Sequence, residues 1–106
     1  METFEVKRLL TEREQSEKPY LEFLRAPDLS MGLYALRSGE KDPQHPHQQD
    51  EVYYVLGGKG KIRVGGQDRD VQAGSIVYVP KRVEHRFHTI VEDLQILVFF
   101  APAETE

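Results

Sequence analysis

The sequence predicts an all-β protein, folded as a barrel or sandwich of short strands. Two observations support this fold class. Apolar residues recur in short, often alternating runs along most of the chain, and turns rich in glycine or proline separate these runs. Residues 5–18 form the one segment whose apolar spacing is compatible with a helix. A length of 106 residues suits a single domain, 1–106, with one core.

The N-terminal part of the chain leaves two structures open. Val6, Leu9 and Leu10 give residues 5–18 a weak apolar stripe, and Pro19 would end a helix there. An exposed loop fits the same composition equally well. Strands are then expected, in chain order, at 20–24, 31–37, 52–56, 61–64, 67–71, 75–79, 85–90 and 94–100.

Turn residues mark the expected ends of these strands. The sequence Ala-Pro-Asp at 26–28 divides the first two, and the glycine-rich run 57–60 closes the third. The pair at 65–66 has the composition of a two-residue hairpin turn, because glycine accepts a positive φ. Residues 91–93 separate the last two strands, and residues 102–106 are expected to fray.

The composition argues against several classes of function. A net charge of −4 and the lack of a basic helix argue against nucleic-acid binding. Without cysteine, neither a disulfide nor a thiolate metal ligand can form. No apolar run approaches the roughly 20 residues that span a bilayer, and the N-terminus lacks the apolar stretch of a signal peptide. We therefore expect a soluble cytoplasmic protein.

The four histidines fall in two short segments and suggest a metal site. His45 and His47 are two residues apart, so an extended chain would present both rings on one face. Glu51 has the same parity, and a later strand that carries His85 could add a fourth donor. Imidazole and carboxylate groups together suit a divalent transition metal ion. Alternatively, the histidines of this proline-rich segment are simply exposed to solvent.

The segment around the first two histidines resembles the first motif of the cupin family. That motif is glycine, five residues, histidine, one residue, histidine, three residues, glutamate, six residues and glycine. In this chain every position is filled, by Gly39, His45, His47, Glu51 and Gly58.

A later segment is similar to the second cupin motif. Gly74, Pro80 and His85 stand at the expected spacing. The segment departs from the motif twice, because Arg82 replaces a glycine and Thr89 replaces an asparagine. The first departure is expected to change the shape of the loop, and the second to change hydrogen bonding around the ligands.

The resemblance covers about residues 30–100 and implies a fold and a cofactor. The fold would be a jelly-roll barrel, or double-stranded β-helix, with a short N-terminal extension. The implied cofactor is one divalent transition metal ion, and Fe, Mn, Ni, Cu and Zn all remain open. The resemblance assigns its ligands as His45, His47, Glu51 and His85.

Strand parity places the neighbouring side chains inside or outside the barrel. Tyr53 shares the parity of Glu51 and faces inward, either as a pocket residue near the metal or as an ordinary core tyrosine. In the strand that carries His85, Phe87 and Thr89 share the parity of His85 and face inward. His88 faces outward there, which suits a surface or interface histidine.

The outward positions of strand 52–56 are also apolar, so this strand needs cover on both faces. Either the N-terminal segment or a second subunit could provide that cover. Cupins similar to this chain often form dimers, and we expect a homodimer. The cations near the motifs could attract a carboxylate-bearing substrate, or could form a solvated rim. These cations are Arg37, Lys41, Lys81, Arg82 and Arg86.

Three classes of function suit such a metal site. The one we favour is a dioxygenase-like oxidoreductase that acts on a small organic molecule. The second is a non-redox isomerase, decarboxylase or lyase, and the third is a module that binds or senses a small ligand. The sequence has neither a G-x-S-x-G elbow nor a Walker loop, which argues against serine hydrolases and nucleotide hydrolases.

Overall fold

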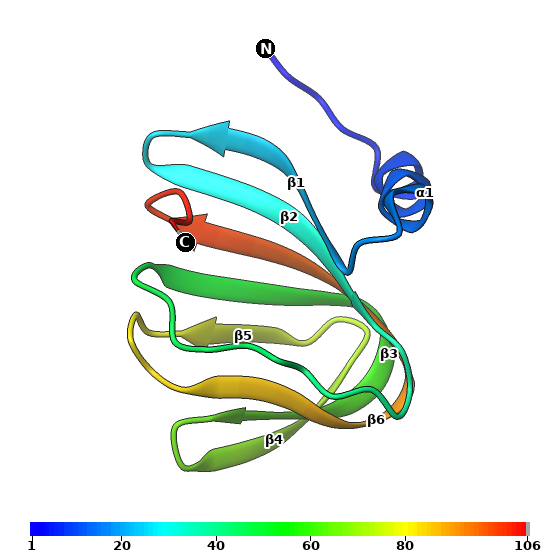
Figure 1. The fold of residues 1–106 in the computed structure, drawn as a ribbon, viewed down its shortest axis with the longest axis vertical. Helices are drawn as coiled ribbons and strands as arrows, with labels where there is room; N and C mark the ends of the chain where they lie inside the picture. The colour runs from blue at the N-terminus through cyan, green and yellow to red at the C-terminus, as the bar shows by residue number, and fades with distance from the viewer. Residues whose placement is uncertain (106) are drawn as a thin grey trace.

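The computed structural model describes residues 1–105, which form one helix and six strands (Figure 1). The strands pair antiparallel in the order β1-β2-β6-β3-β4, and β5 also pairs with β3. The expected all-β fold class is confirmed. In chain order the elements are α1 (Val6–Ser16), β1 (Tyr20–Ala26), β2 (Leu29–Leu36), β3 (Asp50–Val64), β4 (Gln67–Gln72), β5 (Ile76–Val79) and β6 (His85–Ala101).

The long strands β3 and β6 organise the barrel, and each curves round near its middle (Figure 1). They pair from Asp50 and Ala101 at one end to Val64 and His85 at the other, with register shifts between Val55 and Lys61. The prediction that strands end at 57–60 and at 91–93 is wrong, because pairing continues through both segments. The predicted hairpin turn at 65–66 is confirmed, since β3 and β4 pair on either side of it.

Gly58 explains why β3 bends at the glycine-rich run and does not end there. Its φ is 96°, a conformation that glycine adopts without steric penalty. A Cβ atom at this position would also collide with the carbonyl oxygen of Asp93 on β6. The close approach of the two backbones therefore depends on glycine, and such local irregularities increase the bend and twist of a strand pair.

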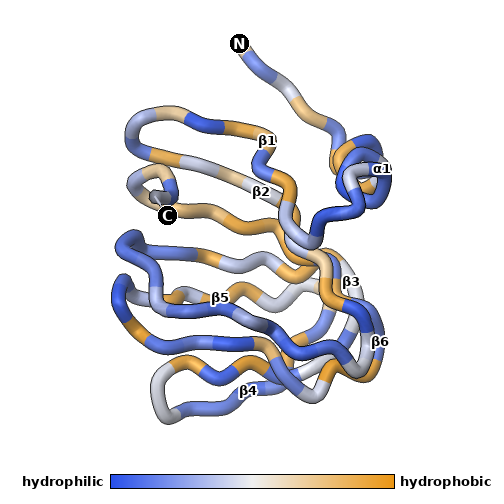
Figure 2. The backbone as a smooth tube through the Cα atoms, viewed as in Figure 1, coloured by the Kyte–Doolittle hydropathy of each residue, from blue (hydrophilic) through white to orange (hydrophobic). Residues whose placement is uncertain are grey.

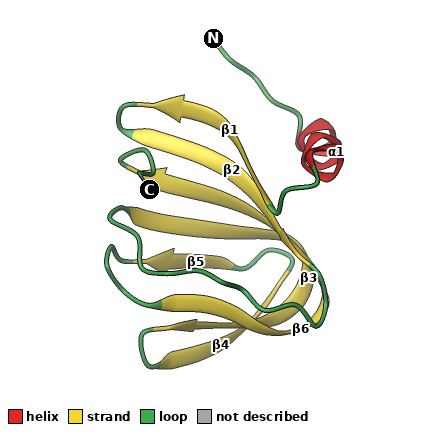
Figure 3. Ribbon diagram, in the orientation of Figure 1, coloured by secondary structure: helices red, strands yellow, loops and turns green. Residues whose placement is uncertain are grey.

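The N-terminal segment, which the sequence left open, is helical over Val6–Ser16. In Figure 3, α1 lies outside the sheet, and the structure has it in contact with β1 and β2. Leu9 is the buried residue of α1. On β2, Leu33 is fully buried although it lies outside the interior core cluster. The helix therefore covers the outer face of this edge of the sheet.

Apolar side chains fill the barrel interior. Figure 2 shows apolar segments interspersed with polar ones along the strands. Tyr53 and Phe87 face inward, as predicted, and both are buried. The prediction for Thr89 is wrong, because it is exposed and the next residue, Ile90, is buried. Thr89 has a φ of 48° beside a register shift in the β3–β6 pairing. An irregularity of this kind shifts the alternation of side chains by one residue.

The C-terminal tail is held in place, so the prediction that it frays is wrong for residues 102–105. The Glu104 N–H donates to Ser30 Oγ at 2.9 Å, and Arg25 Nη2 donates to the Glu104 carbonyl at 2.6 Å. Gln49 Nε2 donates to Thr105 Oγ1 at 2.8 Å. These contacts place the tail beside the starts of β2 and β3. Residue 106 lies outside the described residues.

Apolar side chains remain exposed or partly exposed on the outer face of the sheet, away from α1. We call this the outer patch; it consists of Val52, Tyr54, Ile76, Tyr78, Leu97 and Phe99, which the strand register places on one face. Ile76 is 72% exposed and Tyr78 is 59% exposed. A second subunit as cover for this surface stays a prediction. In residues 1–105 we find no helix with the length and apolar character needed to cross a membrane.

Candidate metal centre

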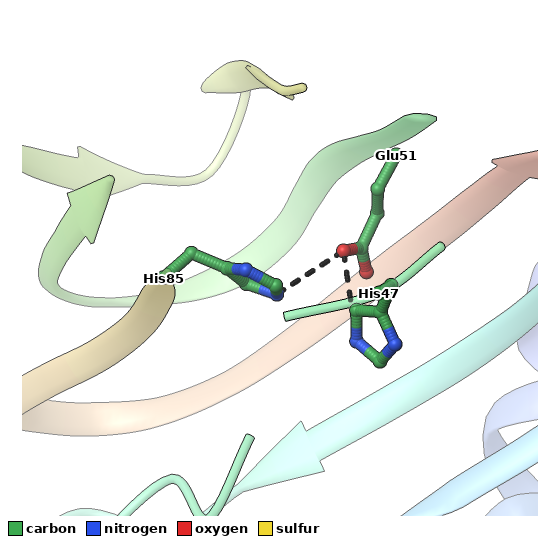
Figure 4. A group of neighbouring side chains, drawn as sticks. All are labelled: His47, Glu51 and His85. Atoms are coloured by element: carbon green, nitrogen blue, oxygen red, sulfur yellow. Dashed lines mark ion pairs between the residues drawn. The ribbon is translucent and has the colours of Figure 1, made fainter. Parts of the chain in front are cut away.

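His47, Glu51 and His85 converge at one end of the barrel, where each can offer one ligand atom to a metal ion (Figure 4). Their ligand atoms all lie within 4.8 Å of one another. His85 Nε2 is 3.2 Å from Glu51 Oε1, and His47 Nε2 is 3.9 Å from the same oxygen. Three of the four predicted ligands are therefore brought together by the fold.

The bend of the long strands accounts for this meeting. Glu51 lies near the start of β3, where it pairs with Phe100, and His85 begins β6, where it pairs with Val64. The two residues are therefore far apart in the β3–β6 ladder, and the curvature of both strands brings their side chains together across the interior. His47 arrives from the loop that leads into β3.

The hydrogen bonds of His85 orient its ring toward Glu51. Nδ1–H donates to the carbonyl oxygen of Val83 at 2.9 Å, which leaves Nε2 directed at the carboxylate. Burial alone would lower the pKa of His85, but the Glu51 carboxylate and the Val83 carbonyl outweigh it and raise the pKa. A metal-ligating histidine typically has this arrangement, with its second nitrogen bonded to a carbonyl or carboxylate.

His47 is oriented from the other side by the C-terminal tail. Its Nδ1 lies 3.4 Å from Glu104 Oε2, and its ring packs edge-on against Phe100 with centroids 5.1 Å apart. Burial lowers the pKa of His47, and the charge of Glu51 offsets this effect only in part. The His47 imidazole therefore stays neutral more readily than that of a free histidine. The neutral imidazole is the form that binds metal. No motif or spacing in the sequence indicates that Glu104 belongs to the site.

The chemistry of this donor set fits a cation. Glu51 is 2% exposed, and within the described chain its Oε1 accepts no well-directed hydrogen bond. A buried polar atom without a partner costs about 1–3 kcal/mol, and more when it is charged. Donors bound at about 2.1 Å to one ion lie roughly 3.0–3.4 Å apart when they are neighbours. The 3.2 Å distance between His85 and Glu51 lies in that range, so these residues fit a metal ion.

His45, the fourth predicted ligand, is not in this group. Its side chain is exposed, and its ring centroid lies 5.4 Å from that of His47. Residues 41–48 form no strand, so the parity argument for an extended chain does not apply to them. Ligation by His45 stays a prediction.

Gln44 contacts the two converging histidines through its side-chain oxygen. Its Oε1 accepts from the Tyr53 hydroxyl at 2.8 Å and lies 3.1 Å from His85 Nε2 and 3.3 Å from His47 Nε2. Its Nε2 donates to Asp42 Oδ2 at 2.7 Å. No cupin motif position indicates Gln44, and sequence reasoning missed it.

Asp42 anchors the loop that carries Gln44. It is a buried carboxylate, whose Oδ1 accepts from the Tyr34 hydroxyl at 2.6 Å and whose Oδ2 accepts from the Phe87 N–H at 2.9 Å. Burial and the bond to Asp42 raise the pKa of Tyr34, so this hydroxyl keeps its proton. The loop is thereby tied to both β2 and β6.

A cavity of about 250 Å³ opens beside the ligand group. Tyr53 lines it, and burial, followed by the charge of Glu51, raises the pKa of this tyrosine well above its usual value. The Tyr20 hydroxyl is buried and has no hydrogen-bond partner among residues 1–105. The wall is mainly aromatic and apolar, and its other members are Tyr20, Tyr34, Pro43, Gln44, His45, Val98, Phe100 and Glu104.

The other polar residues named from the sequence lie elsewhere. His88 Nε2 is 2.7 Å from Asp68 Oδ1 on the outside of the barrel, as an outward position implies. None of the five cations near the motifs lines the cavity. Arg82 has a φ of 65°, which glycine adopts readily, and its N–H donates to the His47 carbonyl at 2.7 Å. The loop thus keeps a glycine-like conformation at this position despite the arginine.

Comparison with known proteins identifies the family. The cupin domain model matches residues 32–100, which is more than half of the chain. The chain belongs to the cupin family, and its antiparallel barrel is the jelly-roll fold of that family.

Individual relatives are similar to this chain in sequence or in structure. An uncharacterized protein of Streptomyces coelicolor is 49% identical over 105 residues, covering 99% of this chain and all of the relative. The crystal structure of TT1209 from Thermus thermophilus superimposes with a TM-score of 0.78 at 29% identity, over 97% of this chain and 99% of that one. Dimethylsulfoniopropionate lyase DddW of Ruegeria pomeroyi is 29% identical over 79 residues, which cover 74% of this chain and 52% of the lyase.

Proposed function

We propose that this cupin binds one divalent transition metal ion through His47, Glu51 and His85 and acts as a dioxygenase on a small organic molecule. The observation that carries the proposal is the convergence of two imidazoles and one carboxylate beside a cavity. A set of two histidines and one carboxylate with open positions is typical of non-heme iron oxygenases. Further protein donors to the same ion would be compatible with this set while two positions stay open.

A bound ion would supply positions at which oxygen and substrate meet. The chain's own residues hold and orient that site. The Val83 carbonyl and the Glu104 carboxylate fix the two imidazoles from behind. Tyr53 stays protonated because its pKa is raised. A dioxygenase places both atoms of O₂ in the product, so the substrate supplies the electrons and no further reductant is needed.

The cavity supports a small, flat and mainly apolar substrate. Its volume of about 250 Å³ holds few non-hydrogen atoms, and its walls are mostly aromatic. An enol, a diketone or a phenol has the required flat shape and an oxygen atom that can reach the ion.

A second candidate function is non-redox chemistry, in which the ion polarises a carbonyl and a side chain transfers a proton. One observation favours it: the cavity wall is not wholly apolar, because it includes the Glu104 carboxylate. The partial likeness to a lyase, DddW, is consistent with this alternative.

Oxygen uptake separates the two candidates. The metal-free protein is reconstituted with Fe(II), Mn(II), Ni(II), Cu(II) or Zn(II) and offered a panel of small enols, diketones and phenols. Oxygen consumption with one redox-active metal, matched by loss of substrate, would support the dioxygenase. Substrate loss that proceeds equally without oxygen, and also with Zn(II), would support the non-redox alternative.

Two variants test whether either activity belongs to this site. His85→Ala removes a ligand, and we expect a strong loss of bound metal by plasma emission spectrometry with the circular dichroism of the strands retained. His88→Ala is the matched control, because His88 lies on the same strand outside the cavity. Unchanged metal content in His85→Ala would contradict the ligand assignment.

A further inference from the structure

We propose that Asp42 is the charge-balancing residue of the metal site: its buried carboxylate offsets the positive charge of the bound ion without ligating it. This inference rests on the proposed metal binding and assigns a role in it to a residue outside the group of convergent ligand atoms. Asp42 falls in the unspecified spacer between Gly39 and His45 of the first cupin motif. The motif therefore assigns it no function.

Asp42 and Glu51 are the two buried carboxylates of residues 1–105, and they are 6% and 2% exposed. Both lie at the end of the barrel where the histidines converge. Asp42 reaches this end through Gln44, which donates to Asp42 Oδ2 and places its own Oε1 3.1 Å from His85 Nε2. A carboxylate withdrawn from water is costly to ionise unless a positive charge lies near it. Two of them at one end of the barrel favour a doubly charged cation there.

The hydrogen bonds of Asp42 indicate that it is ionised. Oδ1 accepts from the Tyr34 hydroxyl at 2.6 Å, and Oδ2 accepts from the Phe87 N–H at 2.9 Å and from Gln44 Nε2 at 2.7 Å. The 2.6 Å bond lies in the short range typical of a hydroxyl that donates to a charged carboxylate. All three donors are neutral, and among residues 1–105 no cationic side chain forms an ion pair with Asp42.

The charge of Asp42 acts on both imidazoles of the ligand group. Burial lowers the pKa of His47, and the charge of Glu51 and, more weakly, that of Asp42 oppose this effect. At His85, burial is outweighed by the contacts with Glu51 and Val83, and the charge of Asp42 adds to the rise in the pKa. A negative field that favours a proton on these nitrogens also favours a metal ion between them, because both are positive charges.

The buried charges of the site sum to zero when Asp42 is counted. Neutral His47 and His85 add no charge, so a divalent ion with Glu51 alone keeps one positive charge, which Asp42 offsets. Glu104 also faces His47, but 21% of its side chain is exposed, so water helps to stabilise its charge. Loss of the Asp42 charge should therefore weaken binding of the metal ion and strengthen binding of a small anion to the loaded site.

Two measurements on the full-length, cobalt-loaded protein separate charge balance from a purely structural role. Asp42→Asn should weaken Co(II) binding about tenfold or more in competition with a coloured chelator, as the loss of supporting groups does at other metal sites. The same variant should bind azide several times more tightly, measured from the visible spectrum of the cobalt, because its loaded site carries an additional positive charge. Unchanged binding of either cobalt or azide would overturn the inference.

Two variants provide matched controls. Tyr34→Phe removes one hydrogen bond of the same carboxylate but keeps its charge, so azide should bind as it does to the wild type. Glu92→Gln removes a carboxylate outside the cavity and should change neither affinity. Azide binding that tightens equally in Tyr34→Phe and Asp42→Asn would show that the loop anchor, and not the charge, is responsible.

The wild type offers a test that does not depend on the folding of a variant. Carbon NMR of the zinc-loaded protein, isotope-labelled at the aspartate carboxyl carbons, should show Asp42 ionised at neutral pH. Its signal can be assigned through the hydrogen-bonded Phe87 N–H. A protonated Asp42 in the loaded protein would overturn the inference. A wild type that binds neither cobalt nor zinc would contradict the proposed function itself.

Discussion

Glu104 Oε2 lies 3.4 Å from His47 Nδ1, which links the C-terminal tail to the metal centre. Carboxylates that hold a ligating histidine through its second nitrogen raise its basicity and fix its tautomer. The tail is positioned for this role by its own bonds to Ser30 and Arg25. A residue 53 positions further along the chain than Glu51 thereby becomes part of the same site.

We predict that Glu104→Gln lowers metal affinity about tenfold, because the amide cannot support the histidine as a carboxylate does. Chelator competition measures the change. Glu92→Gln is a suitable control, since that carboxylate pairs with Lys59 away from the cavity. Equal affinities in Glu104→Gln and the wild type would show that the contact with His47 does not support ligation.

Gly58→Ala should destabilise the fold by more than about 2 kcal/mol, because it combines a left-handed φ with a collision against the β6 backbone. Urea denaturation measures this loss. Gly57→Ala is the matched control, since in residues 1–105 no heavy atom outside Gly57 and its two chain neighbours lies within 4 Å of a Cβ built there. Its cost should stay within about 1 kcal/mol. Similar losses in the two variants would contradict the role of Gly58 in the bend.

The ion pair of Asp68 predicts a pH dependence at the acid end. Hydrogen bonds from Arg63 and then from His88 lower the pKa of Asp68 to about 2. Because the pKa of Asp68 is lower in the folded state, its ionised carboxylate stabilises the fold at pH values above the unfolded pKa of about 3.9. This contribution to stability is lost as the pH falls toward 2. Asp68→Asn should therefore flatten the stability profile between about pH 4 and pH 2, as measured by thermal unfolding. Titration of the Asp68 carboxyl near its unfolded value of about 3.9 by NMR would contradict this account.

The outer patch predicts self-association. Ile76, 72% exposed, is its most exposed member, and an exposed apolar surface of this kind often marks an interface. We expect the wild type to run at twice the chain mass in light scattering, and Ile76→Asp to shift it to the monomer. Val91→Asp is the control, because Val91 is 64% exposed but lies outside the outer patch. A monomeric wild type would contradict the expected homodimer.

The sequence predicted the interior of the barrel well, because strand alternation is a local property. Tyr53 and Phe87 were assigned to the interior from parity alone, and both are buried. The assignment failed at Thr89, where an irregular backbone shifts the alternation. Parity arguments hold only while a strand remains regular, and the sequence of a bend does not show which residue it displaces.

The candidate site was predicted less completely, since it depends on contacts between distant segments. Glu51 and His85 followed from motif spacing, and the structure brings them to 3.2 Å. Gln44 and Glu104 reach the site only through a folded loop and a returning tail. Their positions depend on anchors such as Asp42, whose burial the local sequence does not indicate.

The position of the C-terminal tail also determines where a purification tag can be attached. A tag or fusion partner attached after residue 106 would be separated from Glu104 by only two residues. Such a tag would disturb the contacts of Thr105 and Glu104 and displace the Glu104 carboxylate from the cavity wall. The N-terminal end enters the fold through α1, on the outer face of the sheet. Purification handles for metal-binding assays should therefore be attached there, and a C-terminal handle should be removed before affinity is measured.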